Sequence, residues 1–225
     1  MYVGRVMHTE LVTVAPDTSL MKAREILEQR KIAHLLVVNA RGDLVGIVSD
    51  RDLKQNWASP AVALSKHELN YLLNKVTVDQ IMVKKILTVS PLTTIERAAL
   101  IMEQNRISAL PVLDEGRLAG IITSRDVMQV LLEAIGIDDD SRRLTVILED
   151  RIGFLADMSR LLRDAEINIR SLFAWPDKNS PGYYHLVMRV NAADGDKALA
   201  VLEENGYKVL TAYTKDIAPF LSRPE

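Results

Sequence analysis

Short hydrophobic runs alternate with helically spaced hydrophobic positions along the first quarter of the chain. Apolar residues that recur on one helix face predict a helix over 20–30. Continuous apolar runs at 32–38 and 44–48, separated by a polar turn, predict a β-hairpin. A second helix is expected to begin at Asp50 or Arg51. With a strand before the first helix, the predicted order is strand, helix, strand, strand, helix.

The same pattern occurs a second time. Residues 46–52 read Gly-Ile-Val-Ser-Asp-Arg-Asp, and residues 120–126 read Gly-Ile-Ile-Thr-Ser-Arg-Asp. Upstream, the Thr-Val-x-Pro of 13–16 returns at 88–91. Two copies of roughly sixty residues therefore fill the first part of the chain. One such copy leaves an apolar sheet face uncovered, so two copies are expected to pack together as one stable object.

The repeated heptapeptide resembles the end of the CBS motif, in which a strand runs into a helix that touches a nucleotide. The resemblance implies an α/β CBS-domain pair. We expect a first CBS domain over residues 1–58, a linker over 59–76 and a second CBS domain over 77–137. In the linker, Leu69, Leu72 and Leu73 suggest a short helix.

The pattern changes after residue 140. Its periodicity predicts strand, helix, strand, strand, helix, strand, with strands at 144–148, 167–175, 183–190 and 207–213 and helices at 154–162 and 198–204. This βαββαβ order in about 75 residues implies a ferredoxin-like α+β sandwich of one sheet and two helices.

This last segment resembles an ACT domain, expected over residues 142–218. The family's first turn, approximately Asp-x-Pro-Gly-x-Leu, stands here as 150–155, with Ile152 in place of the proline. The Asn-Ile pair that begins the family's second strand is present as Asn168-Ile169. Two CBS domains followed by an ACT domain resemble the bacterial acetoin-utilisation regulatory proteins, over nearly the whole chain.

Composition and charge exclude several classes of function. The 225 residues include no cysteine, which removes disulfides and zinc-thiolate sites. The 28 basic residues are balanced by 30 acidic ones, so the basic surplus typical of nucleic-acid binding is missing. No apolar run reaches the roughly 18–20 residues of a membrane-spanning helix, and the start of the chain lacks a signal-peptide core. We therefore expect a cytoplasmic protein.

The repeated Ser/Thr-x-x-Asp step has two interpretations. Ser49-x-x-Asp52 and Thr123-x-x-Asp126 can each be a capping box at a helix start, although such a box prefers Glu or Gln because Asp is short for that role. Alternatively, each Asp accepts hydrogen bonds from ribose hydroxyls, while the Ser or Thr and the helix start face a phosphate. The CBS resemblance favours nucleotide contact for at least one copy.

Apolar and cationic residues complete the predicted nucleotide sites. Ile47, Ile121 and the strand entries would form the walls around adenine, and His34, Arg51 and Arg125 are the candidate phosphate ligands. His34 either binds phosphate or is a packed strand residue, and its counterpart in the second copy is Ala109. The predicted nucleotide-binding set is Thr13, Val14, His34, Ile47, Ser49, Arg51, Asp52, Thr88, Val89, Ile121, Thr123, Arg125 and Asp126.

The ACT segment offers a second candidate site. ACT domains commonly bind amino acids between paired domains, and the resemblance implies such a site at Gly153, Phe154, Leu155, Asn168 and Ile169. The structural alternative is that Gly153 admits the turn and Asn168 ends a strand; the missing proline slightly favours this alternative.

Sequence motifs for catalysis are missing. The chain has no P-loop, no Gly-x-Ser-x-Gly elbow and no His pair at metal-ligand spacing. We expect a non-catalytic regulatory protein without cofactor or metal that senses AMP, ADP, ATP or a similar adenosine ligand and forms a homodimer. The alternatives are a ligand-free scaffold, a regulatory subunit of an acetoin or carbon-metabolism enzyme, and an enzyme that uses the nucleotide as substrate. The sequence does not name the protein that it regulates.

Overall fold

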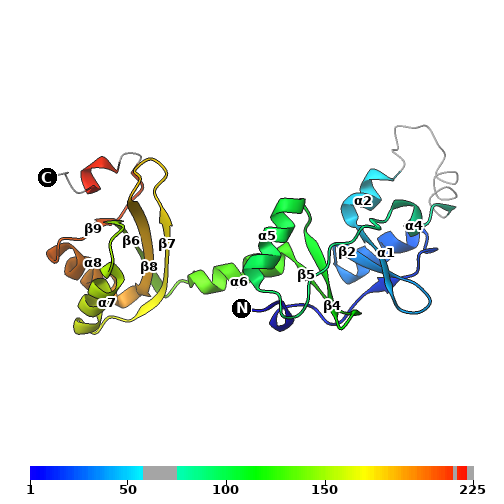
Figure 1. The fold of residues 1–225 in the computed structure, drawn as a ribbon, viewed down its shortest axis with the longest axis horizontal. Helices are drawn as coiled ribbons and strands as arrows, with labels where there is room; N and C mark the ends of the chain where they lie inside the picture. Colours follow the sequence, from blue (N-terminus) through cyan, green and yellow to red (C-terminus); the bar gives the residue numbers. More distant parts are fainter. Residues whose placement is uncertain (58–74, 215–216, 222–225) are drawn as a thin grey trace. The chain divides into compact units, whose positions relative to one another are not determined.

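The computed structural model describes residues 1–57, 75–214 and 217–221. The chain divides into two compact units, Met1–Met128 and Gln129–Glu225, which are described separately. The first unit contains both sequence repeats, and the second contains the ferredoxin-like segment (Figure 1). The linker helix suggested around Leu69–Leu73 falls outside the described residues.

The first copy has the predicted element order. It comprises β1 (Thr13–Val14), α1 (Leu20–Arg30), β2 (His34–Val38), β3 (Leu44–Ser49) and α2 (Asp50–Gln55). The sheet order is β1-β2-β3, with β1 parallel to β2 and β3 antiparallel to it. The helix α1 begins where predicted, because the Ser19 side chain accepts a hydrogen bond from the Lys22 amide. That amide lies in the first turn of the helix and has no backbone partner within it.

The second copy repeats the arrangement. It comprises α4 (Val78–Ile81), α5 (Ile95–Asn105), β4 (Ala109–Asp114), β5 (Arg117–Thr123) and α6 (Ser124–Ile135). Where the first copy has β1, the second has a single parallel bridge from Val89 to Val112. Both hairpins carry a register shift at the same point, Val37/Val38 and Val112/Leu113. The repeat in the sequence is thus a repeat of backbone geometry.

Each copy packs against the segment that precedes the other copy in the sequence. Residues 1–8 pack on the second copy, where the Val3 amide donates to the Thr93 carbonyl at 2.8 Å. Residues 76–83 pack on the first copy, where the Val78 amide donates to the Thr18 carbonyl at 2.9 Å. We call residues 1–8 and 76–83 the exchanged segments.

A methionine of each exchanged segment lies against a glycine of the opposite hairpin. A Cβ on Gly46 would lie 2.2 Å from Met82 Sδ, and a Cβ on Gly120 would lie 2.6 Å from Met7 Sδ. The glycine of the repeated heptapeptide is therefore required by this close approach, because any side chain there would occupy the space of the methionine.

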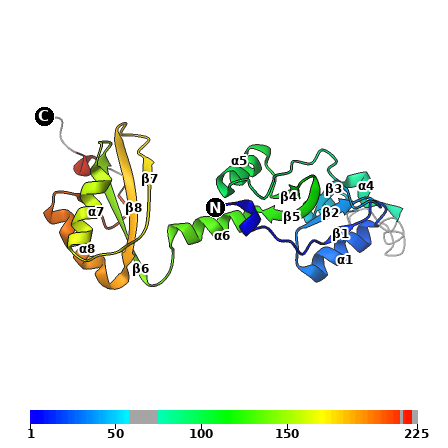
Figure 2. The same cartoon turned by 60° about the horizontal axis from the view of Figure 1, so that its bottom comes forward.

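The second unit is the predicted ferredoxin-like sandwich. Its elements are β6 (Ser141–Glu149), α7 (Phe154–Asp164), β7 (Ile169–Pro176), β8 (Tyr183–Asn191), α8 (Gly195–Glu204) and β9 (Lys208–Leu210). The sheet order is β7-β8-β6-β9, all antiparallel, and α7 and α8 cover one face (Figure 2). The buried core lies between that face and the two helices.

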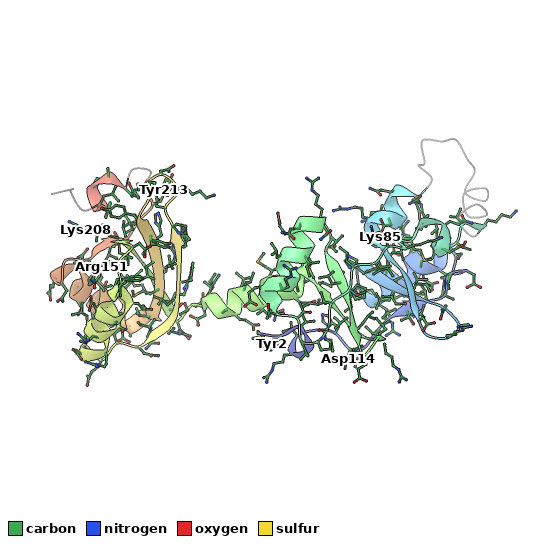
Figure 3. All side chains as sticks on the ribbon, viewed as in Figure 1. Tyr2, Lys85, Asp114, Arg151, Lys208 and Tyr213 are labelled. Atoms are coloured by element: carbon green, nitrogen blue, oxygen red, sulfur yellow. The ribbon has the colours of Figure 1, made fainter. Side chains whose placement is uncertain are left out.

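The last strand is shorter than predicted. We expected it over 207–213, but β9 covers only Lys208–Leu210, because its pairing with β6 is confined to Thr145–Ile147. Tyr213, labelled in Figure 3, has a 91% exposed side chain and lies beyond this register. None of the helices in the described residues has the length and apolar character needed to cross a membrane.

Candidate functional site

The Ser49-x-x-Asp52 step forms a complete capping box where β3 runs into α2. Ser49 Oγ accepts a hydrogen bond from the Asp52 amide at 3.2 Å. Asp52 Oδ2 in turn accepts from the Ser49 amide at 2.8 Å and from Ser49 Oγ at 2.6 Å. The expectation that Asp is too short for this role is wrong, because the extended backbone of Ser49 brings its amide within reach.

The cap occupies only one oxygen of Asp52. No donor to Asp52 Oδ1 is found within the part of the chain that the structure describes. The carboxylate is half-buried. It can therefore hold the helix start through Oδ2 and accept further hydrogen bonds through Oδ1, so the two interpretations of this residue are compatible.

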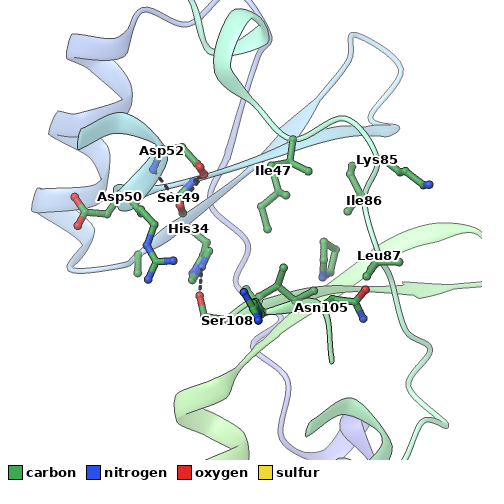
Figure 4. A pocket seen from close by; sticks show the side chains of 17 residues that line it. His34, Ile47, Ser49, Asp50, Asp52, Lys85, Ile86, Leu87, Asn105 and Ser108 are labelled. Carbon is green, nitrogen blue, oxygen red and sulfur yellow. Dashed lines mark hydrogen bonds between the residues drawn. The ribbon is translucent and has the colours of Figure 1, made fainter. Parts of the chain in front are cut away.

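This carboxylate lies in a cavity of about 730 Å³ that both copies line (Figure 4). The size is within the usual range for a small-molecule site. Five predicted nucleotide-binding residues line it together, all from the first copy: His34, Ile47, Ser49, Arg51 and Asp52. The remaining lining residues are Ala33, Asp50, Val83, Lys85, Ile86, Leu87, Asn105, Arg106, Ile107, Ser108, Ala109 and Pro111.

His34 connects the two copies across the cavity. Its Nε2 lies 3.0 Å from the Oγ of Ser108, which belongs to the second copy (Figure 4). Burial lowers the pKa of His34 by disfavouring the charged imidazole, and the nearby charge of Asp52 opposes this effect without reversing it. In the structure described, His34 therefore favours its neutral form.

Different parts of the cavity offer different chemistry. The apolar side chains Ile47, Val83 and Ile86 suit a planar base. The cations Arg51 and Arg106 suit phosphate, while Lys85 lies at the rim with its side chain leading away from His34 (Figure 4). An apolar wall, a carboxylate acceptor and cations match the base, the ribose hydroxyls and the phosphate of a nucleotide in their chemistry. Within the described residues, no group of three His, Asp or Glu side chains is placed to hold a metal ion.

The predicted strand-entry residues lie outside this cavity. Thr13 and Val14 form β1, where Val14 is buried in the core of the first copy, and Val89 is buried beside Val112. Thr88 lines a second cavity of about 740 Å³ between the two hairpin turns. The prediction placed the strand entry slightly too far along the chain, because Lys85–Leu87, directly before Thr88, form the wall.

The second copy repeats the cap but not the open carboxylate. Asp126 Oδ2 accepts from the Thr123 amide at 2.8 Å and from Thr123 Oγ1 at 2.7 Å. Its other oxygen, Oδ1, lies 3.0 Å from His8 Nε2. Ile121 pairs with the His8 backbone, and Arg125 is exposed. Neither of the two cavities described above is lined by these predicted residues.

The predicted amino-acid site of the ACT segment is divided between turn, core and surface. Gly153 has φ of 90°, so it admits the left-handed turn before α7. Phe154 and Ile169 pack against the core of the second unit. Leu155 is 43% exposed and Asn168 is exposed. Neither cavity described above includes these five residues.

Sequence reasoning missed the contribution of the second copy to the first copy's site. Asn105 is the last residue of α5, Arg106 ends that helix in the left-handed conformation with φ of 54°, and Ser108 follows two residues later. This turn directs the chain into the cavity wall. The repeat was the available signal, since two packed copies must bring the helix end of one near the helix start of the other.

Comparison with known proteins identifies both modules. Residues 3–58 and 78–133 match the CBS domain, and residues 142–213 match the ACT domain. A CBS domain-containing protein from Dictyostelium discoideum is 32% identical over 134 residues, which is 59% of this chain and 92% of that protein. The chain also matches homoserine O-acetyltransferases from Methanohalobium evestigatum and other organisms, but spans only 24% of the length of that enzyme.

Solved structures of similar proteins cover the CBS pair. A CBS-domain protein from Agrobacterium tumefaciens covers 58% of this chain and 99% of its own, at 30% identity and a TM-score of 0.50. A putative acetoin utilization protein from Vibrio cholerae covers 60% of this chain and 93% of its own, at 26% identity and a TM-score of 0.49. The chain therefore belongs to the CBS-domain proteins, with a CBS pair followed by a C-terminal ACT domain.

Proposed function

We propose that this chain is a cytoplasmic, non-catalytic regulatory protein whose CBS pair senses an adenosine-containing nucleotide. The observation that carries the proposal is the half-free carboxylate of Asp52 in a cavity made by both copies. A ribose diol would donate to Asp52 Oδ1, the adenine would lie against Ile47, Val83 and Ile86, and phosphate would meet Arg51 and Arg106.

The charges of the cavity favour a phosphorylated ligand. Beside the aspartates, the wall holds the cations Arg51, Lys85 and Arg106. S-adenosylmethionine presents a sulfonium cation where a nucleotide presents phosphate. We expect AMP, ADP or ATP to bind more tightly than that ligand, because like charges in one site repel.

The ACT domain would provide dimerisation and a candidate amino-acid site at Gly153 and Asn168. Both outer strands of its sheet, β7 and β9, have one edge without a partner strand in the described sheet. Such an edge can pair with a second copy of the chain. Binding of ligands by the two modules would then change how the dimer engages its target.

Thermal shift and calorimetry test this function. The full chain is heated with AMP, ADP, ATP, S-adenosylmethionine, NAD and, separately, the amino acids. A ligand that binds only the folded state raises the melting temperature. A ligand-free scaffold would show no shift with any of them. Analysis of the nucleotide after incubation separates a sensor, which returns it unchanged, from an enzyme, which converts it.

A further inference from the structure

His8 occupies in the second copy the place that Val83 occupies in the first. The two residues directly follow Met7 and Met82 in the exchanged segments. The His8 amide donates to the Ile121 carbonyl at 2.9 Å and its carbonyl accepts from the Ile121 amide at 3.0 Å. The Val83 amide donates to the Ile47 carbonyl at 2.9 Å and its carbonyl accepts from the Ile47 amide at 3.1 Å. The positions are therefore equivalent, and only the side chains differ.

This difference decides whether the repeated aspartate is open. Val83 lines the cavity and has no group that can donate to Asp52. His8 holds Asp126 Oδ1 at 3.0 Å, while Thr123 holds Oδ2. Both oxygens of Asp126 are thus engaged within the chain. Burial alone would raise the pKa of Asp126, but hydrogen bonds from Thr123 and His8 outweigh it and lower the pKa, so this carboxylate is ionised.

We propose that His8 closes the second copy's site, so that each chain binds one nucleotide, at Asp52. This inference rests on the proposed function of the CBS pair. A ribose at Asp126 would have to displace the imidazole from Oδ1 and lose that hydrogen bond. The backbone of His8 cannot move aside readily, because its pairing with Ile121 fixes it.

Calorimetric stoichiometry with AMP and with ATP tests the closure. The wild-type chain is expected to bind one nucleotide, and Asp52→Ala is expected to lose most of this binding. His8→Ala frees Asp126 Oδ1 and should raise the number bound to two per chain. The double variant Asp52→Ala/His8→Ala should regain one. The His8 side chain is 61% exposed, so its loss leaves the core intact.

The reciprocal substitution tests the same idea from the first copy. Val83→His places an imidazole where it can reach Asp52 Oδ1, and the affinity is expected to fall roughly tenfold or more, the value of one hydrogen bond to a charged group. Val83→Leu is the matched control, since it changes the size of the side chain but adds no donor. Nitrogen-15 spectra of the histidines give a second readout. Nucleotide should shift the ring signals of His34 and leave those of His8 in place.

Two results would overturn the inference and leave the proposed function standing: a wild-type chain that binds two nucleotides, or a His8→Ala variant that still binds one. If no variant binds any nucleotide, the proposed function fails and this inference fails with it.

Discussion

The geometry of Asp52 is compatible with both roles that the sequence presented as alternatives. One oxygen completes the cap of α2, and the other remains without a donor in the described residues. A short acidic side chain after Ser or Thr therefore does not distinguish a structural from a binding residue. The two copies differ at one equivalent position of the exchanged segments, where the first has Val83, a lining residue of the cavity, and the second has His8, which contacts Asp126 Oδ1.

Replacing Asp52 tests its contact with ribose. We expect Asp52→Ala to weaken nucleotide binding by about 1.5–3 kcal/mol, the range for a hydrogen bond to a charged group. The loss of the cap should lower the free energy of unfolding by about 1 kcal/mol. Calorimetric titration measures the first effect and thermal unfolding the second.

Asp126→Ala is the matched control, because it removes the same cap from the second copy. It should cost similar stability and leave binding at the Asp52 site unchanged. Any binding at its own site should weaken in the same way. Unchanged nucleotide affinity in the double variant Asp52→Ala/Asp126→Ala would contradict the proposal that the CBS pair binds a nucleotide.

We expect His34 to make nucleotide binding dependent on pH. Burial lowers the pKa of the free imidazole, whereas a bound phosphate would raise it, so binding takes up a proton. As pH rises through the raised value the imidazolium is lost, and affinity should fall by at most about tenfold per pH unit, since one proton is involved. The measurement is calorimetry between pH 6 and 8 in buffers of different ionisation enthalpy.

His34→Gln is the control for this titration, because Gln can bond Ser108 but does not titrate. The nucleotide phosphate itself becomes more negative as pH rises through about 6, which also changes the affinity. Both proteins share this effect, so the difference between their pH dependences reports His34 alone. Equal pH slopes in both proteins would mean that His34 is a packed strand residue. Without ligand, the lowered pKa predicts that His34 reduces stability as pH falls below about 6.5, because protons then bind the unfolded chain more readily.

At the scale of elements, the periodicity of apolar residues predicted most of the fold. The bounds of α1 are as expected, and both hairpins and all six elements of the ACT sandwich are present. The short β9 was not predictable, because Tyr207–Tyr213 has a strand pattern and only its pairing with Thr145–Ile147 limits it. The cavity wall at Asn105–Ser108 was also missed, because no local pattern shows which helix end faces which helix start.

The contact between Gly46 and Met82 couples the exchanged segment to the site. We expect Gly46→Ala to destabilise the chain by about 1–3 kcal/mol, because the new Cβ would lie 2.8 Å from Met82 Cγ and 2.2 Å from its Sδ. Affinity should also fall, since Val83, Lys85 and Ile86 follow this methionine into the cavity wall. Denaturant unfolding and calorimetry measure the two effects.

Gly120→Ala is the paired control in the second copy. Its Cβ would crowd Met7, so stability should fall similarly while the affinity of the Asp52 site stays unchanged. The double variant Gly46→Ala/Met82→Ala should recover part of the lost stability, because the smaller side chain makes room. No recovery would mean that the steric contact is not the cause.

For the whole molecule, we expect a homodimer. Met128, Leu131 and Leu132 on α6 and Ile137 after it are large apolar residues with 39–56% exposure. With the free edges of β7 and β9, they give both modules surface for a second copy. The full chain should be dimeric in light scattering at micromolar concentration. A chain shortened to end at Ile137 should dimerise more weakly, and a monomeric full-length protein would contradict the prediction.

The exchanged segments also impose an order of events during synthesis. Residues 1–8 leave the ribosome long before the second copy that they complete, so they must wait for it. The first copy is delayed, because the Leu20 amide donates to the Val76 carbonyl and the Val78 amide donates to the Thr18 carbonyl, and the two partners of each bond are roughly sixty residues apart in the sequence. The first copy therefore lacks its exchanged segment until residue 83 has left the ribosome. The first copy can therefore mature only after the linker and the second exchanged segment have emerged, and a translational pause inside the linker would leave the first copy's apolar surface open to chaperones.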